Sequence, residues 1–235
     1  MSTNWSKRID DTVYLLLCGF ALVLPILETP KNILAFLLLL AWTVSRLISR
    51  NDSLWKPSLG LVEGSLLLMV AATVVSTAIN WPFPNGLKGF KDVFLQSLIF
   101  WVIYRARFSE HQQLRLAEIM VLGVIIGIVW GIADVFLGHR PQLQFHSAGA
   151  VSQSAIYLGT AFILVFSVAL MASESPPPDA ALHKRAAIWW VGGTIMIVAL
   201  FLMGSRGPLA ASLLAMFAVA ILAGKKRFIL FAAAL

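Results

Sequence analysis

Long runs of apolar residues alternate with short polar gaps along almost the whole chain. Each run has roughly the length of a helix that crosses the hydrocarbon core of a bilayer. The pattern predicts spans at residues 12–27, 32–48, 59–79, 86–104, 116–137, 151–172, 186–203 and 208–223. We therefore expect an all-α fold, a polytopic transmembrane helix bundle of eight spans.

A ninth apolar run begins at Phe228 and reaches Leu235, the last residue of the sequence. Half a crossing cannot satisfy its backbone polar groups in lipid, because no water is present there to pair with them. We therefore expect residues 1–235 to form a single transmembrane helical domain that is the N-terminal part of a longer membrane protein.

Composition supports a membrane protein: 59% of the residues are hydrophobic and 12% are charged, against about a quarter charged in soluble domains. The net charge of +7 is compatible with nucleic-acid binding, but the basic residues lie in short gaps between apolar runs. Membrane topology and anionic lipids explain them better, so we expect membrane lipids and no nucleic acid as partners. The single cysteine, Cys18, excludes an internal disulfide and a Cys-based metal cluster.

The basic residues are distributed unevenly between the two sets of gaps. Thirteen of the 18 Lys and Arg residues fall in alternate gaps, and basic loops are retained in the cytoplasm. This distribution predicts a cytoplasmic N-terminus, because the reverse orientation would expose the cluster at residues 225–227 outside. The five that then face outward are Lys31, Lys88, Lys91, Arg140 and Arg206.

Each of the four outer gaps that lead into an inward-running helix carries at least one of these five cations. A helix N-terminus already bears a partial positive charge, so a cation beside it costs stability but favours a bound anion. In the first of these gaps, Thr29 or Asn32 is expected to cap the helix of span 32–48. Lys31 beside them is interpreted as an interface anchor, and a functional role is the less favoured alternative.

Lys88 is expected in the first turn of span 86–104, after a turn that contains Pro82 and Pro84. One interpretation is an ion pair with Asp92, four residues further on. The alternative is a functional role, because the apolar stretch that follows is too short to cross a membrane without carrying Lys88 to its boundary.

The gap at residues 138–150 contains His139, Arg140 and His146, and Gln153 follows at the mouth of the next span. Polar side chains at a helix entrance often cap backbone N–H groups. The same groups, with Arg140 upstream, are also suited to the oxygens of a phosphate or a sugar. Asp134, near the outer end of span 116–137, either neutralises Arg140 or acts as a base; we favour structural pairing for Asp134 and for Glu63.

The sharpest local motif is Gly-Ser-Arg-Gly-Pro at residues 204–208. Pro208 suits a first helical turn, and either Ser205 or Gly207 can cap the helix. Arg206 is then a permanent cation at a helix N-terminus, with a planar fork that matches phosphate oxygens. The alternative is an Arg that contacts lipid head groups.

Two segments of the chain, FHSAGAVSQSAIYLG at residues 145–159 and MGSRG at 203–207, resemble the O-antigen ligase and polymerase family of bacterial envelope assembly. The span pattern extends the likeness over most of the chain. Ligases often have His and Asn where this chain has Ala150 and Ser152, so neither residue is assigned a sugar-contacting role.

The resemblance implies a metal-independent glycosyltransferase of the bacterial inner membrane that needs no cofactor. Such enzymes move a glycan from an undecaprenyl-pyrophosphate carrier to the lipid A core on the periplasmic side, in lipopolysaccharide biosynthesis. Arg206 would be the catalytic residue, and the general base would lie on a late periplasmic loop beyond Leu235. The residues expected to bind pyrophosphate or sugar are Lys88, Arg140, His146, Gln153 and Ser205.

Two alternatives stay open at this point. A glycan polymerase of the same family differs only in its acceptor, which the sequence does not identify. A transporter of an anion or a lipid-linked sugar is less favoured, because transporters place polar groups near the membrane midplane and here they cluster at the outer boundary.

Overall fold

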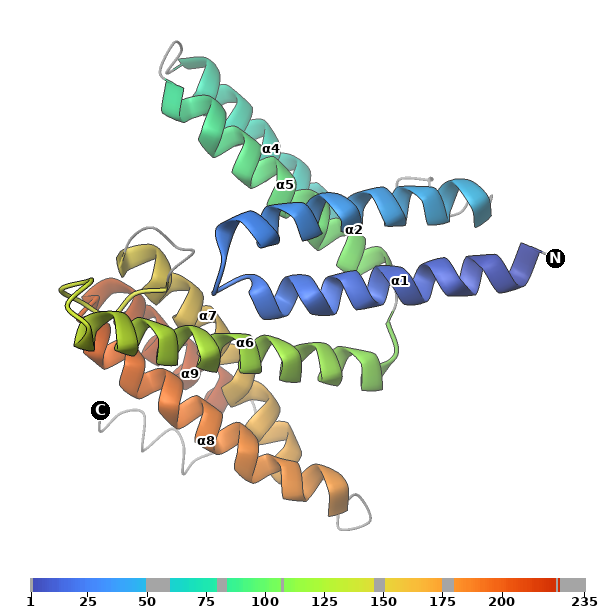
Figure 1. Ribbon diagram of the computed structural model, residues 1–235. Helices are drawn as coiled ribbons and strands as arrows, with labels where there is room; N and C mark the ends of the chain where they lie inside the picture. The colour runs from blue at the N-terminus through green and yellow to red at the C-terminus, as the bar shows by residue number, and fades with distance from the viewer. Residues whose placement is uncertain are drawn as a thin grey trace. The chain divides into compact units, whose positions relative to one another are not determined.

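The computed structural model describes residues 2–49, 60–79, 84–106, 108–145, 151–174, 180–222 and 224. For residues 2–9, 49, 61–62, 84–89, 91–93, 152–153, 171, 174 and 180–185 it gives the backbone only. Within these ranges all regular secondary structure is helical, as predicted (Figure 1). The helices are α1 (Ser2–Val23), α2 (Glu28–Ser49), α4 (Leu61–Ile79), α5 (Pro84–Ala106), α6 (Glu110–Phe136), α7 (Val151–Glu174), α8 (Ala180–Met203) and α9 (Arg206–Leu222).

Each of these helices contains most or all of one predicted span, so the all-α prediction is confirmed for the described part of the chain. In the described part of the chain three helical segments are long and apolar enough to cross a membrane, namely Glu28–Ile48, Glu110–Phe136 and Ala186–Met203. These segments indicate a membrane protein. The eight-span count and the side of the N-terminus stay predictions, and residues 228–235 lie outside the described residues.

The chain divides into two compact units. Unit 1 comprises Met1–Phe20 and Asn32–Gln113, and unit 2 comprises Ala21–Lys31 and Leu114–Leu235. The expectation of one helical domain over residues 1–235 stays a prediction.

Two predicted helix starts are wrong. We expected Thr29 or Asn32 to cap the second helix, but α2 begins at Glu28. The Lys31 N–H donates to the Leu27 carbonyl at 3.3 Å, so Leu27 occupies the capping position and Pro30 falls in the first turn, where proline is tolerated. Similarly, α5 begins at Pro84, which moves Lys88 from the expected first turn to the start of the second.

In unit 1, α4 and α5 pack against each other and are joined by an ion pair. Arg105 Nη2 lies 3.0 Å from Glu63 Oε1, and the two side chains are 12% and 9% exposed. Glu63 is in the first turn of α4 and Arg105 in the last turn of α5, so each charge also complements the dipole of its own helix. The structural pairing predicted for Glu63 is confirmed.

Aromatic contacts connect this ion pair to α2. The Arg105 guanidinium lies over the Trp101 ring, 5.9 Å from its centroid, and Trp101 meets the Trp42 ring edge-on at 5.0 Å. The Arg46 guanidinium lies over the Trp42 ring, 5.6 Å from its centroid. Stacked guanidinium and indole groups attract each other most where water is scarce, so this row stabilises the packing of α2 on α5.

α1 is joined to α2 by a short hydrogen bond from Ser45 Oγ to Asp10 Oδ1, 2.6 Å long. Ser45 is fully buried, and a buried hydroxyl costs free energy unless it is hydrogen-bonded. In unit 1 a hydrogen bond therefore links α1 to α2, a contact between indole rings links α2 to α5, and an ion pair links α5 to α4.

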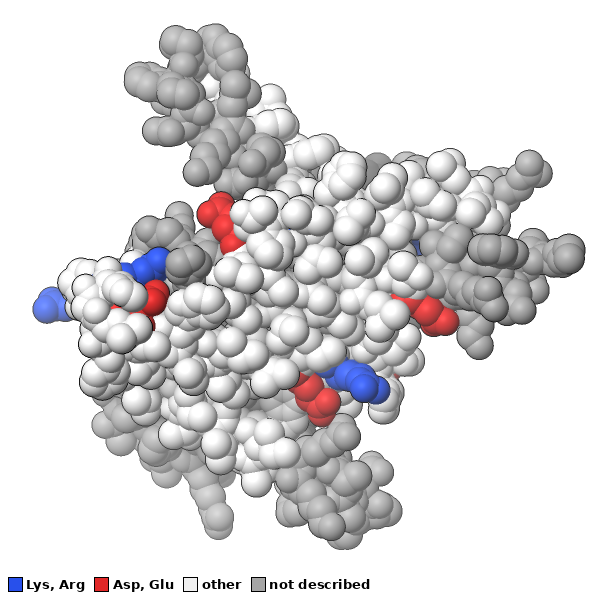
Figure 2. Space-filling view, in the orientation of Figure 1, with Lys and Arg blue, Asp and Glu red and all other residues white. Residues whose placement is uncertain are grey.

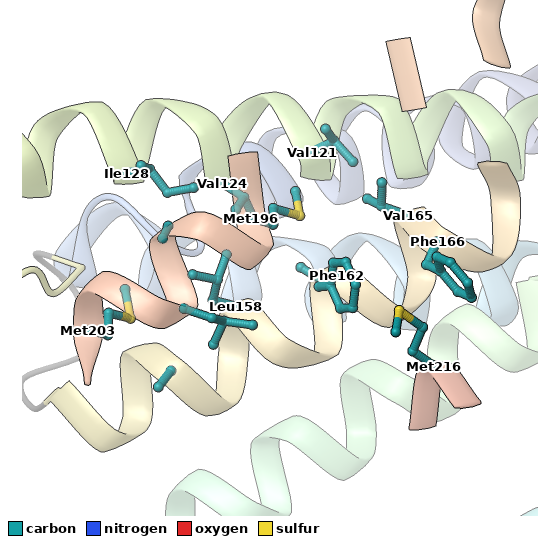
Figure 3. Close-up of a cluster of buried hydrophobic side chains, with 14 of the residues drawn as sticks. Val121, Val124, Ile128, Leu158, Phe162, Val165, Phe166, Met196, Met203 and Met216 are labelled. Carbon is teal, nitrogen blue, oxygen red and sulfur yellow. The ribbon is translucent and has the colours of Figure 1, made fainter. Parts of the chain in front are cut away.

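In unit 2, α7 packs along α8 and also contacts α9. Figure 3 shows apolar side chains of α6, α7 and α8 that point toward one another and fill the space between these helices. The fully buried members include Val124, Leu158, Val165 and Met196. Because α7 contributes buried residues from Ala155 to Leu170, it is the central helix of this core.

Candidate functional site

Two polar connections of unit 2, the α6–α7 loop and the α8–α9 turn, lie at the same end of the unit (Figure 1). In Figure 1 the end of α6, the start of α7, the end of α8 and the start of α9 lie at the same end of this unit. We call this region the loop end of unit 2 and define it as residues 134–145, 151–154 and 204–208. It contains Arg140 and Arg206, two of the five outward cations that the sequence predicts, together with Asp134, His139 and Ser205.

α6 ends in a turn that fixes the first residues of the loop. Gly138 has a φ of 72°, a left-handed conformation that costs glycine little and other residues more. Its N–H donates to the Val135 carbonyl at 3.1 Å, and the His139 N–H donates to the Asp134 carbonyl at 2.9 Å. This is the hydrogen-bond pattern of a helix that ends at a C-terminal glycine, and it holds His139 above the last turn of α6.

The Asp134 carboxylate contacts both basic residues that follow. Oδ2 lies 3.5 Å from Arg140 Nε, and Oδ1 lies 3.6 Å from His139 Nδ1. The side chains of Asp134, Arg140 and His139 are 13%, 20% and 65% exposed. The predicted pairing of Asp134 with Arg140 is confirmed, so part of the Arg140 charge is already compensated.

Arg140 also closes the loop onto α7. Its Nη1 donates to the Phe145 carbonyl at 3.5 Å, and the Phe145 N–H donates to Ser154 Oγ at 3.0 Å. Phe145 and Ser154 are both fully buried, and the Phe145 ring meets Tyr157 edge-on. Ser154 therefore holds the loop and does not cap α7, because its oxygen accepts from the N–H of Phe145, which precedes the helix.

Three glycines of α6 lie four residues apart, and the last two of them, Gly127 and Gly131, provide the surface on which this loop rests. A Cβ on Gly127 would lie 3.2 Å from the Phe145 ring, and one on Gly131 would lie 2.7 Å from the Gln144 carbonyl oxygen. At Gly123 a Cβ would collide with the carbonyl oxygen of Leu22. Small residues at this spacing allow close approach between packed segments.

The close packing of the loop against the α6 glycines can be tested directly by substitution. Gly131→Ala should lower the free energy of unfolding by about 1–3 kcal/mol, because the added methyl group forces residues 143–144 away from α6. The matched control is Gly64→Ala in α4, where nothing lies within 4 Å of the added methyl; it should be neutral or stabilising by up to about 1 kcal/mol. Thermal unfolding in detergent, followed by tryptophan fluorescence, compares the two variants. Equal melting temperatures would contradict the close packing at Gly131.

The turn between α8 and α9 presents Arg206. Gly204 has a φ of 65°, and its N–H donates to the Phe201 carbonyl at 3.0 Å. The Leu209 N–H donates to the Ser205 carbonyl at 3.2 Å, so Ser205 is the capping residue and the alternative cap at Gly207 is wrong. Arg206 is the first residue of α9 and its side chain is exposed.

The structure brings together some of the sequence-predicted site residues. Arg140, Ser205 and Arg206 lie at the loop end of unit 2, as does the backbone of Gln153 in the first turn of α7. The side chain of Gln153, the side chain of Lys88 in α5 and all of His146 lie outside the described residues. Lys88 belongs to unit 1, so its predicted role is untested.

Charged groups are sparse on the visible surface. In Figure 2 most described atoms belong to uncharged residues, and the Lys, Arg, Asp and Glu side chains form a few small groups. A surface of this kind suits a lipid environment, and it makes the charged loop end of unit 2 chemically distinct from the apolar helices behind it.

Two features of this end were not identified from the sequence. One is the contact of His139 with Asp134, which depends on the turn at Gly138. The other is the row of α6 glycines, whose spacing of four was a readable signal. The chain matches no protein-family model, no curated protein and no solved structure.

Proposed function

We propose that the protein is an O-antigen ligase-like glycosyltransferase that moves a glycan from undecaprenyl pyrophosphate to the lipid A core, without a metal ion. The single observation that carries the proposal is the position of Arg206. It is an exposed guanidinium at the first residue of a helix, next to a cap whose side chain adds no negative charge. The sequence resemblance supplies the choice of donor and acceptor.

The chemistry of the donor matches this position. When the bond between the anomeric carbon and the pyrophosphate oxygen breaks, the leaving oxygen takes up negative charge. A guanidinium and the N–H groups of a helix start both stabilise such charge, and they do so most strongly where water is partly excluded. Arg140 at the same end of unit 2 adds a second guanidinium, which Asp134 and the Phe145 carbonyl hold in place.

We further propose that α1, α2 and α4–α9 are eight membrane spans of the bacterial inner membrane, with the N-terminus in the cytoplasm and the loop end of unit 2 in the periplasm. The helices have 17 to 27 residues, which corresponds to about 26–40 Å at 1.5 Å per residue. The uneven distribution of Lys and Arg between alternate gaps supports this orientation.

The orientation is tested by labelling the two ends of α6 in a Cys18→Ala background. Leu137→Cys lies at the loop end and Glu110→Cys at the first residue of the helix, and both positions are exposed. A membrane-impermeant maleimide should label Leu137→Cys in intact spheroplasts, and Glu110→Cys only after the membrane is permeabilised. The opposite pattern would place Arg206 in the cytoplasm and overturn the periplasmic site.

The activity is tested with the purified protein in nanodiscs, given a lipid-linked glycan and lipid A core. We expect glycan on lipid A core and release of undecaprenyl pyrophosphate, with the rate unchanged by EDTA. Extension of a second lipid-linked glycan in place of lipid A core would identify a polymerase instead. No transfer to either acceptor, by protein that is folded and correctly oriented, would reject the enzymatic proposal.

A further inference from the structure

The end of α6 presents an apolar segment and a histidine in close succession. Phe136 and Leu137 are 86% and 69% exposed, and His139, two residues after Leu137, is 65% exposed. Gly138 has a left-handed φ of 72°, which turns the chain at the end of the helix. An exposed apolar surface next to an exposed basic side chain is suited to a ligand that joins a hydrocarbon chain to an anion.

The two charges beside His139 cancel each other. Asp134 Oδ2 lies 3.5 Å from Arg140 Nε, so this carboxylate and this guanidinium together carry no net charge. The other carboxylate oxygen, Oδ1, lies 3.6 Å from His139 Nδ1. A proton on the imidazole therefore changes the net charge of the three side chains from zero to +1. The nearby carboxylate favours this charged form, because opposite charges attract.

The other described residues that the α6–α7 loop contacts carry no charge near neutral pH. On α6 the loop packs against Gly127 and Gly131, and on α7 Ser154 and Tyr157 contact Phe145 of the loop. These side chains are apolar or hydroxyl-bearing. Among these contacts, the protonation of His139 therefore decides whether the loop is neutral or positively charged.

The backbone holds His139 in place beside the ion pair. The His139 N–H donates to the Asp134 carbonyl at 2.9 Å, and the Arg140 N–H donates to the same oxygen at 3.3 Å. Arg140 Nη1 donates to the Phe145 carbonyl at 3.5 Å, which holds the far side of the loop. Because Nδ1 of His139 faces Asp134, Nε2 on the other side of the ring is the nitrogen suited to a ligand.

We propose that His139, in its protonated form, binds a pyrophosphate oxygen of the polyprenyl-linked donor; this inference rests on the proposed function. The Nε2–H donates to that oxygen, and the charge of the imidazolium offsets part of the charge on the pyrophosphate. The polyprenyl chain lies against Phe136 and Leu137. His139 transfers no proton to or from the reacting groups. Asp134 is a positioning residue, because it orients His139 and favours its charged form.

The binding test uses farnesyl pyrophosphate, a short polyprenyl pyrophosphate, and the protein in phosphatidylcholine nanodiscs without an acceptor. Thermophoresis at about pH 6 and pH 8 measures the Kd on either side of the range in which histidine loses its charge. His139→Ala should raise the Kd about 3–10-fold over the wild type at the lower pH and change it little at the higher pH. The phosphate also titrates near about pH 6, and the ratio of the two Kd values removes this contribution.

Inorganic pyrophosphate separates the polyprenyl-linked ligand from a free phosphate. It should bind more weakly than farnesyl pyrophosphate, and Phe136→Ala should weaken the binding of farnesyl pyrophosphate alone. Equal binding of the two ligands would overturn the contact with the polyprenyl chain. His111→Ala is the matched histidine control, because His111 is exposed near the opposite end of the same helix, and it should bind both ligands as the wild type does.

Asp134→Asn tests the charge balance. The asparagine keeps the shape of the side chain but leaves the charge of Arg140 uncompensated. Asp134→Asn should therefore bind farnesyl pyrophosphate more tightly than the wild type at about pH 8, where the wild-type imidazole is neutral. Weaker binding at this pH, by a variant that unfolds at the wild-type temperature, would overturn the proposed charge balance.

The transfer assay distinguishes a failure of this inference from a failure of the proposed function. His139→Ala should raise the KM for the lipid-linked donor about 3–10-fold at about pH 6, with little change in kcat. An unchanged KM, in an assay that Arg206→Ala abolishes, would overturn the role of His139 and leave the proposed function intact. A Kd ratio that is the same at both pH values would also overturn it. No transfer by the wild-type protein, with pH-dependent binding as expected, would reject glycosyl transfer and support the pyrophosphate ligand.

Discussion

Arg206→Ala should abolish the long-chain glycan linked to lipid A, while the lipid-linked precursor accumulates and the protein level stays unchanged. Removal of one group that stabilises a developing negative charge typically lowers kcat by about 10²–10³-fold. The substitution should not affect folding, because the side chain is exposed and lies in the first turn of α9. Envelope glycans separated on a gel, together with an immunoblot of the protein, provide the measurement.

Arg206→Lys separates charge from shape. Lysine keeps the positive charge but offers a single ammonium group in place of a planar fork that binds two phosphate oxygens at once. We expect Arg206→Lys to show only a small part of the wild-type ladder, that is, the series of gel bands from long-chain glycan linked to lipid A. Full activity in Arg206→Lys would show that charge alone is needed, and the paired phosphate contact would be wrong.

The control for both variants is Arg115→Ala, which removes another exposed arginine from unit 2, near the start of α6. It should leave the ladder at wild-type intensity. If Arg206→Ala also left the ladder at that intensity, the catalytic role of Arg206 would be wrong. Loss of the ladder in Arg115→Ala alone would move the site away from the loop end of unit 2.

Much of the fold was predictable because hydropathy over a long run is a strong and local signal. Each of the eight predicted spans lies mostly or wholly within a described helix, yet the helix ends differ because they depend on capping contacts and not on hydropathy. α6 begins at Glu110, six residues before the expected span, where Ser109 and Gln112 cap each other. The Ser109 N–H donates to Gln112 Oε1 at 3.0 Å and the Gln112 N–H donates to Ser109 Oγ at 3.3 Å, a capping box that the sequence does contain.

The candidate site was predictable in its residue types and less so in its contacts. Asp134 and Arg140 were expected to pair because they carry opposite charges across one helix end. His139 was not assigned to the same carboxylate, since that contact depends on a left-handed turn at Gly138. The partner of Glu63 was also not identifiable, because Arg105 is 42 positions away and the two meet only through the packing of α4 on α5.

The ion pair between Glu63 and Arg105 should contribute more to stability than any exposed charge pair. Arg105→Ala and Glu63→Gln should each lower the free energy of unfolding by about 3–5 kcal/mol, because each leaves its partner charge mostly buried without compensation. Arg105→Ala should cost more, since it also removes the guanidinium from the Trp101 ring. Unfolding in mixed micelles at increasing SDS concentration measures both changes.

The double variant makes this prediction specific to the pair. When Glu63→Gln and Arg105→Ala are combined, the loss should be well below the sum of the two single losses, because no unpaired charge is left behind. Glu110→Gln is the matched control, since Glu110 is also in the first turn of a helix but is exposed, and it should change stability by less than about 1 kcal/mol. Additive losses would show that each side chain acts independently. Small single losses would show that solvent reaches the pair and screens it, as at an exposed surface.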